Sequence, residues 1–155
     1  MIFSENLKKN NIIVNAKSDN RWSLIEEMLN TAIKSKDVKE KDRDIIKNAL
    51  IEREKSMTTG IGKGIAIPHC ATSKIDDAII VLALCHQGID FNSIDNQPVN
   101  IAILLLIPNN KLKQHIKTLA NIARVISDKR LRETLLNLKN QESIFKAICE
   151  YEKNL

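Results

Sequence analysis

The residues best suited to chemistry lie in one short segment near the middle of the chain. It starts at Arg53, whose planar guanidinium suits phosphate or carboxylate, and ends at His69, whose imidazole is a good nucleophile near neutral pH. Between them stand three of the chain's four glycines, which let backbone N–H groups form an anion-binding concavity. Two threonines add hydroxyl donors. The residues expected to cradle a phosphate are Thr58, Thr59, Gly60, Ile61, Gly62 and Gly64.

Two familiar nucleotide-binding loops do not fit this segment. The Walker loop ends in Gly-Lys-Ser/Thr, whereas here Lys63 is followed by Gly64. The dinucleotide fingerprint opens a helix, whereas these glycines alternate and precede a predicted strand. On residue physics alone, a glycine-rich turn beside a structural histidine explains the segment as well as a phosphate site does.

The chain has two further histidines. His115 borders the predicted apolar face of a helix, so it is either a partly buried histidine at a helix–sheet seam or a second functional imidazole. His86 ends an apolar strand, and we interpret it as structural or exposed. A zinc site from His69, Cys70, Cys85 and His86 is disfavoured, because neighbouring strand residues point to opposite faces.

The apolar spacing predicts the elements that position these side chains. We expect strands at 11–14, 65–67, 78–85 and 99–107, and helices at about 20–34, 40–54, 110–126, 128–138 and 141–151. Asp19 is the predicted cap of the first helix. The later strands are almost continuously apolar, which is typical of strands covered on both faces. The order strand-helix-helix-strand-strand-strand-helix-helix-helix predicts an α+β fold, a three-layer α/β/α sandwich with a central mixed β-sheet.

Three of these helices have a predicted buried face at the helical period. The apolar positions are Trp22, Ile25, Met28, Leu29, Ala32 and Ile33 in the first helix, Ile45, Ile46, Ala49 and Leu50 in the second, and Leu112, Ile116, Leu119, Ala120, Ala123 and Ile126 in the third.

Composition limits the function classes. With 155 residues, 43% hydrophobic and 28% charged, the chain predicts one globular domain over residues 1–155. The longest apolar run, Val99–Pro108, is too short to cross a membrane, and no signal peptide is visible. Three widely spaced cysteines favour reduced thiols in a cytoplasm. The net charge is +5, but the basic residues are mixed with acidic ones along the chain. Aromatic residues, which would stack on bases, make up only 3%. Both observations disfavour nucleic-acid binding.

The segment from Arg53 to His69 resembles the active-site signature of phosphotransferase-system (PTS) enzyme IIA domains of the fructose/mannitol type (type 2). The resemblance continues through Gly88–Phe91, Asp95–Val99 and the helix carrying His115, and it covers nearly the whole chain. Within that group the chain looks most like the nitrogen-regulatory enzyme IIA. Residues 111–114 are more basic than the acidic run common before this histidine in the family.

The resemblance implies a cytoplasmic phosphocarrier of the phosphoenolpyruvate-dependent system, without cofactor or metal. His69 is then the phosphoryl acceptor, His115 stabilises the phosphoryl group and Arg53 positions it. The implied partners are a histidine-containing phosphocarrier protein as donor, and regulatory target proteins or an enzyme IIB as recipient, with no nucleic acid and no membrane insertion. The alternatives are a sugar-specific enzyme IIA that passes the group to an enzyme IIB for sugar uptake, and a binding module that has kept only the fold.

Overall fold

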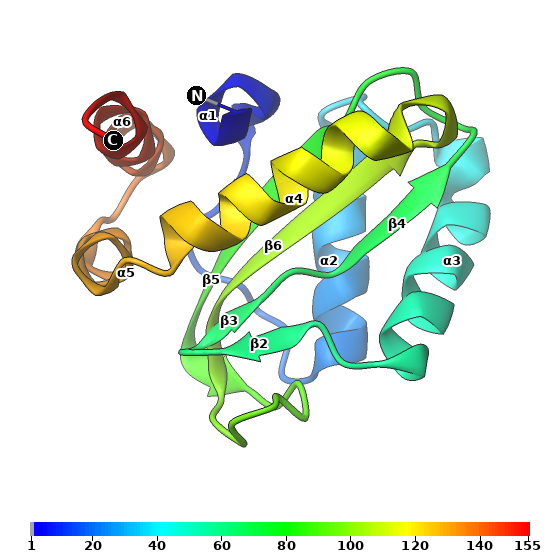
Figure 1. The fold of residues 1–155 in the computed structure, drawn as a ribbon. Helices are drawn as coiled ribbons and strands as arrows, with labels where there is room; N and C mark the ends of the chain where they lie inside the picture. The colour runs from blue at the N-terminus through cyan, green and yellow to red at the C-terminus, as the bar shows by residue number, and fades with distance from the viewer. Residues whose placement is uncertain (1) are drawn as a thin grey trace.

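A mixed sheet of six strands lies at the centre of the computed structural model, which describes residues 2–155 (Figure 1). The strands are β1 (Leu7–Ile13), β2 (Gly60–Gly62), β3 (Ile65–Ala66), β4 (His69–Thr72), β5 (Ile79–Ile89) and β6 (Val99–Pro108). β5 and β6 are the long antiparallel central pair. β1 adds parallel to β5, while β3 and β4 share the other edge of β6 in parallel register, and β2 pairs with β3.

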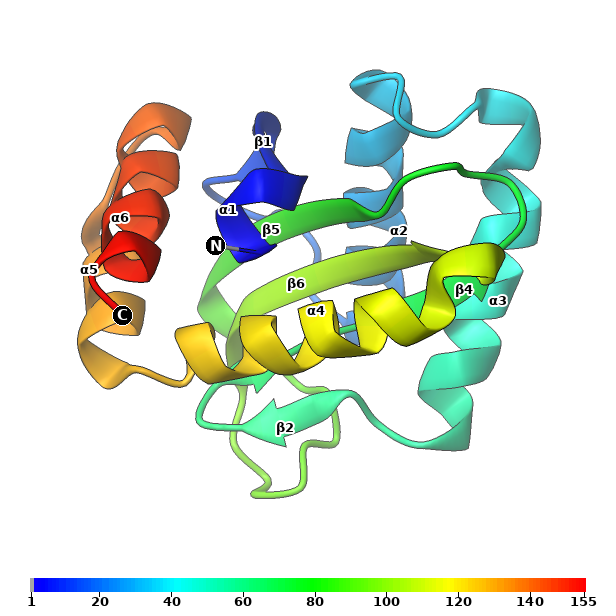
Figure 2. The same cartoon turned by 45° about the horizontal axis from the view of Figure 1, so that its top comes forward.

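Helices cover both faces of this sheet (Figure 2). On one side lie α2 (Arg21–Lys34) and α3 (Arg43–Ser56); on the other lie α1 (Ile2–Asn6), α4 (Leu112–Ile126), α5 (Lys129–Asn137) and α6 (Gln141–Lys153). Short 3-10 turns at Glu40–Asp42 and Asn109–Lys111 lead into α3 and α4. A separate apolar cluster lies on each face of the sheet. Side chains of α2 and α3 contribute to one cluster, and side chains of α4, α5 and α6 contribute to the other.

The predicted three-layer sandwich around a mixed sheet is confirmed, and the element order differs in detail. The structure adds the N-terminal helix α1, the hairpin strand β2 and the strand β4 after Pro68. Proline lacks an N–H group, yet the chain resumes pairing one residue later, because β4 lies at a sheet edge and bonds only to β6.

The helix predicted at about 20–34 is α2, and it begins at Arg21, one residue later than predicted. Its N-cap is Asn20, whose side chain accepts a hydrogen bond from the Ser23 N–H, so the choice of Asp19 as cap was wrong. The predicted apolar face of α2 is buried or packed against the core. In α3, Ile46, Ala49 and Leu50 face the core, but Ile45 is 54% exposed.

The buried face of α4 was also predicted incorrectly. Leu119, Ala123 and Ile126 pack on the sheet as expected, whereas Leu112, Ile116 and Ala120 are exposed. The buried positions of α4 are His115, Thr118, Ile122, Val125 and Ile126. His115 and Thr118 can be buried because they hydrogen-bond to one another.

Candidate functional site

His69 is the first residue of β4, directly after Pro68, and is half-buried. Its register partner Leu105 and its neighbour Ile67 both belong to the apolar cluster beneath α4. Cys70 belongs to the opposite cluster, beneath α2 and α3. Because successive strand residues alternate between faces, the His69 ring lies on the α4 side of the sheet.

The backbone defines which ring nitrogen of His69 is free. Nδ1 lies 2.8 Å from the Ile67 carbonyl oxygen. A carbonyl oxygen only accepts, so Nδ1 carries the proton and donates it. Nε2 then holds the lone pair of the neutral ring, and it has no hydrogen-bond partner among residues 2–155.

Burial holds the pKa of His69 below its ordinary value of 6.5. The bond to the Ile67 carbonyl opposes this shift, the nearby Arg53 cation adds to it, and the Glu54 anion opposes it. The ring is therefore neutral at pH 7, which is the state in which Nε2 can act as a nucleophile.

His115 lies in the first turns of α4 and faces the same side of the sheet as His69. It is only 5% exposed, and its Nδ1 lies 3.0 Å from the Thr118 hydroxyl. Burial lowers the pKa of this imidazole, with a further contribution from the Lys111 charge. Figures 1 and 2 both show the start of α4, the helix that carries His115, beside β4.

Arg53 lies in the last turn of α3, immediately before the glycine-containing segment. Its Nη1 donates to the Met57 carbonyl at 2.8 Å, which places the guanidinium across the end of the helix. The guanidinium is close enough to His69 for its charge to lower the pKa of that ring. The structure thus brings the Arg53 guanidinium close enough to the His69 ring for the two groups to interact electrostatically.

The glycine-containing segment forms the tight hairpin between β2 and β3. Gly62 and Gly64 have φ of +95° and +78°, in the left-handed region that favours glycine. Several of its donors bind within the protein: the Thr58 and Thr59 hydroxyls bond Phe91 and Glu54, and the Gly60 N–H bonds Thr58. The Lys63 N–H bonds Asp95. A phosphate-binding role for this loop stays a prediction.

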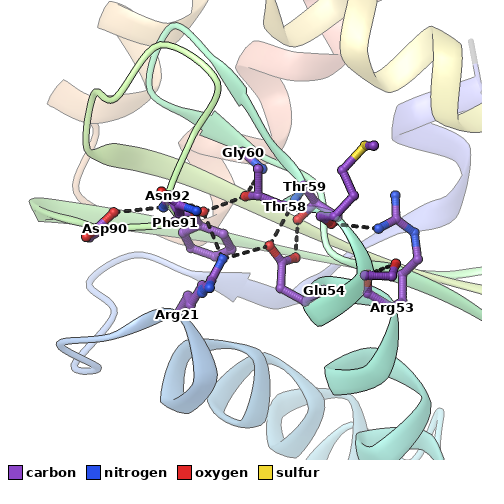
Figure 3. A network of polar contacts seen from close by, with 11 residues as sticks. Arg21, Arg53, Glu54, Thr58, Thr59, Gly60, Asp90, Phe91 and Asn92 are labelled. Carbon is purple, nitrogen blue, oxygen red and sulfur yellow. Dashed lines mark hydrogen bonds and ion pairs between the residues drawn. The ribbon is translucent and has the colours of Figure 1, made fainter.

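A buried acid next to Arg53 is the feature that sequence reasoning missed (Figure 3). Glu54 is 2% exposed and accepts the N–H of Thr59 at 2.9 Å and the hydroxyl of the same residue. Arg21 on α2 lies 3.6 Å from the carboxylate and also donates to the Phe91 carbonyl at 3.0 Å. The sequence held one signal for this role. Glu54 lies in the last turn of a predicted helix, where the helix dipole disfavours negative charge, so a partner outside the helix could have been expected.

The structure also gives the surroundings of the cysteine and histidine side chains that could ligate a metal. Within residues 2–155, no group of three or more metal-ligating side chains comes together. Burial raises the pKa of Cys70 to about 12, so its thiol stays protonated at neutral pH. His86 is exposed, and its Nε2 lies 3.1 Å from the Val14 carbonyl oxygen. Within the same residues, no helix is both long and apolar enough to span a membrane.

Comparison with known proteins places this arrangement in context. Residues 5–151 match the family described as "Phosphoenolpyruvate-dependent sugar phosphotransferase system, EIIA 2". The chain is 36% identical over 114 residues to the "Nitrogen regulatory protein" of Klebsiella oxytoca, covering 71% of this chain and 68% of that one. It is 29% identical over 153 residues to the "PTS system fructose-specific EIIABC component" of Bacillus subtilis, covering 99% of this chain and 24% of that protein.

Solved structures of enzyme IIA proteins have the same fold as this chain. The nitrogen regulatory protein IIA-Ntr of Neisseria meningitidis superposes with a TM-score of 0.84 at 25% identity, covering 94% of this chain and 97% of that one. IIA mannitol of Escherichia coli superposes with a TM-score of 0.78 at 19% identity over 92% of this chain and 98% of that one, which supports the fold alone. The family resemblance inferred from the sequence is confirmed.

Proposed function

This chain belongs to the EIIA type 2 family of the phosphoenolpyruvate-dependent phosphotransferase system, and we propose that it carries a phosphoryl group on Nε2 of His69. The observation that carries the proposal is the bond from Nδ1 to the Ile67 carbonyl, which leaves a neutral ring with its lone pair on Nε2. Burial and the Arg53 charge support the neutral state at pH 7.

The donor is a phosphohistidine on a histidine-containing carrier protein. The Nε2 lone pair of His69 attacks the phosphorus, a new P–N bond forms, and the P–N bond to the donor imidazole breaks. The electron pair of the broken bond returns to the donor nitrogen. His69 keeps its Nδ1 proton, so its ring becomes cationic and is balanced by the phosphoryl dianion. The transfer exchanges one imidazole for another, so it is close to symmetric and readily reversed.

Two side chains are proposed to stabilise the transferring group. The Arg53 guanidinium can bind equatorial phosphoryl oxygens with its planar fork. His115 can donate from Nε2 when its Nδ1 accepts the hydrogen bond from the Thr118 hydroxyl. Groups that are already oriented before the reaction lower the barrier by charge stabilisation without reorganising. Residues 1–155 are proposed to act as one domain in this reaction.

We further propose that this member is regulatory and works in the cytoplasm. Several relatives are nitrogen regulatory proteins, and IIA-Ntr of Neisseria meningitidis has the same fold. Phosphorylation would add nearly two negative charges on the face of the sheet that α4 covers, and α4 exposes Leu112 and Ile116 to solvent, so we expect the charge to change which proteins can bind this face. The alternative of sugar transport is favoured by the match to a fructose-specific component across 99% of this chain.

The phosphocarrier role is tested by incubating the chain with labelled phosphoenolpyruvate, enzyme I and the carrier protein. We expect one acid-labile, base-stable phosphoryl group on the wild type and none on His69→Ala with an unchanged circular dichroism spectrum. Equal labelling of the variant would remove His69 from the role of acceptor. Offering the phosphorylated protein to fructose- and mannitol-type enzyme IIB separates the two functions, because efficient transfer supports transport and contradicts regulation.

A further inference from the structure

Three consecutive hydrogen bonds, linked through the main chain of Thr59 and of Ile67, connect the buried carboxylate of Glu54 to the ring of His69. The carboxylate accepts the N–H and the hydroxyl of Thr59. The Thr59 carbonyl accepts the N–H of Ile67 at 3.1 Å, and the Ile67 carbonyl accepts Nδ1–H of His69 at 2.8 Å. The Ile67 carbonyl selects the tautomer of His69. Ile67 is held by the main chain of Thr59, and Glu54 fixes the main chain of Thr59.

Glu54 is poorly placed to stabilise its own helix. It lies in the last turn of α3, where the partial negative charge of the helix end opposes a carboxylate. It is also 2% exposed, and a buried carboxylate is costly unless it is paired. Its partners, Thr59 and Arg21, both lie outside α3. The acid therefore serves to bind the segment that follows the helix.

A second branch fixes the same segment one residue earlier (Figure 3). Arg21, which faces Glu54, also donates to the Phe91 carbonyl at 3.0 Å. The Thr58 hydroxyl donates to that same carbonyl and accepts the Gly60 N–H at 3.0 Å. Both threonines are thus anchored on protein groups, which leaves Thr59 little freedom to move its carbonyl away from Ile67.

We propose that Glu54 and Thr59 are positioning residues for phosphoryl transfer, because they hold the Ile67 carbonyl where it keeps the proton on Nδ1 of His69. The inference rests on the proposed role of His69. Loss of the Glu54 carboxylate or of the Thr59 hydroxyl would weaken the anchor of the Thr59 main chain and let the Ile67 carbonyl tilt, and the ring could then carry its proton on Nε2 instead. A ring in that tautomer has no lone pair on Nε2 and cannot attack phosphorus there.

The test measures the tautomer of His69 directly by long-range ¹H–¹⁵N NMR at a pH above its pKa. Wild type is expected to hold the Nδ1–H tautomer alone, and Thr59→Val and Glu54→Gln are expected to hold a mixture. Thr59→Ser keeps the hydroxyl and restores the wild-type spectrum. The Nδ1–H tautomer persisting unmixed in both variants would overturn the proposal, and Thr59→Val decides it if Glu54→Gln does not fold.

The matched control is Glu152→Gln in α6. Glu152 is also a buried carboxylate, 5% exposed, and it accepts the backbone N–H groups of Phe3 and Ser4 at 3.0 and 2.7 Å. Among residues 2–155, no hydrogen bond or ion pair connects Glu152 to Glu54, Thr59, Ile67 or His69. Its replacement is expected to lower stability and leave the His69 tautomer unchanged. A tautomer shift in the control equal to that in Thr59→Val would show that lost stability is the cause and would overturn the proposal.

A kinetic measurement separates this inference from the carrier function. Phosphoramidate serves as a small-molecule phosphoryl donor, and the saturating rate and half-saturating concentration are measured for each variant. Thr59→Val is expected to lower the saturating rate by about 10–100-fold with an unchanged half-saturating concentration, since it misplaces the nucleophile and not the donor. If wild type is not phosphorylated but the tautomer still shifts, the carrier function fails and the positioning of the ring stands.

Discussion

Replacing Gly60 by alanine should damage the hairpin because another loop occupies the space that a side chain would need. A Cβ built on Gly60 would lie 2.3 Å from the Ser93 hydroxyl oxygen, 3.0 Å from its Cβ and 3.1 Å from the Phe91 Cβ. The φ of Gly60 is outside the left-handed region, so backbone strain does not contribute. The cost comes from pushing residues 91–94 away, which also strains the bond from the Ile94 N–H to the Gly60 carbonyl.

Overpacking of this kind costs about 1–3 kcal/mol of unfolding free energy. With a urea dependence of about 1–3 kcal/mol per molar for a small protein, a loss of about 2 kcal/mol lowers the urea midpoint by roughly 1 M. Urea unfolding can be followed by circular dichroism and by the fluorescence of Trp22, the only tryptophan of the chain. Coincident transitions from the two probes would support two-state analysis.

A second substitution tests whether Ser93 is the cause. Its hydroxyl has no hydrogen-bond partner among the described residues, so Ser93→Gly loses no bond and costs about 0.5–1 kcal/mol through backbone freedom. In the double variant the closest contacts disappear, and we expect the two free-energy changes to be less than additive by about 1–2 kcal/mol. Additive changes, or a single Gly60→Ala variant as stable as wild type, would refute the packing argument.

Three further outcomes test the site. His115→Ala should still accept a phosphoryl group on His69 but pass it on about 100–1000-fold more slowly, measured by single-turnover transfer to the recipient protein. Arg53→Lys should also lower the transfer rate, because an ammonium does not replace a planar fork, and wild-type rates would make the guanidinium structural. Burial holds the pKa of His69 below 6.5, so the rate of phosphorylation should stay level at neutral pH and fall only as pH drops through that lowered pKa. An inflection above 6.5 would contradict the buried, neutral ring.

The parts of the fold that sequence reasoning predicted correctly are those with one strong physical signal. The residues of β5 and β6 form near-continuous apolar runs, which are typical of strands covered on both faces. The apolar face of α2 recurs at the helical period and lies in the core as expected. These signals were sufficient to predict the layers of the sandwich and the existence of its two long strands.

The parts that were missed depend on tertiary contacts that have no local signal. The strand β4 has four residues and follows a proline, and it exists because it adds to the edge of β6. Glu54 stood within the recognised segment without a role, because its partner Arg21 comes from a different helix. The hydroxyls of Thr58 and Thr59 and the N–H of Gly60 were expected to face a ligand, but all three bind groups within the protein instead.

The face that α4 buries is rotated from the face that its apolar pattern predicts. The pattern favoured burying Leu112 and Ile116, but these side chains are 45% and 56% exposed, while His115 is 5% exposed. Two apolar side chains in water cost free energy, so the orientation must be set by what lies beneath the helix. Thr118 is 2% exposed and bonds His115 there, while Ile122, Val125 and Ile126 continue the same stripe onto the sheet. Turning the helix to bury Leu112 would rotate His115 and Thr118 out of this buried stripe, so the observed orientation keeps that hydrogen-bonded pair buried and leaves Leu112 and Ile116 exposed.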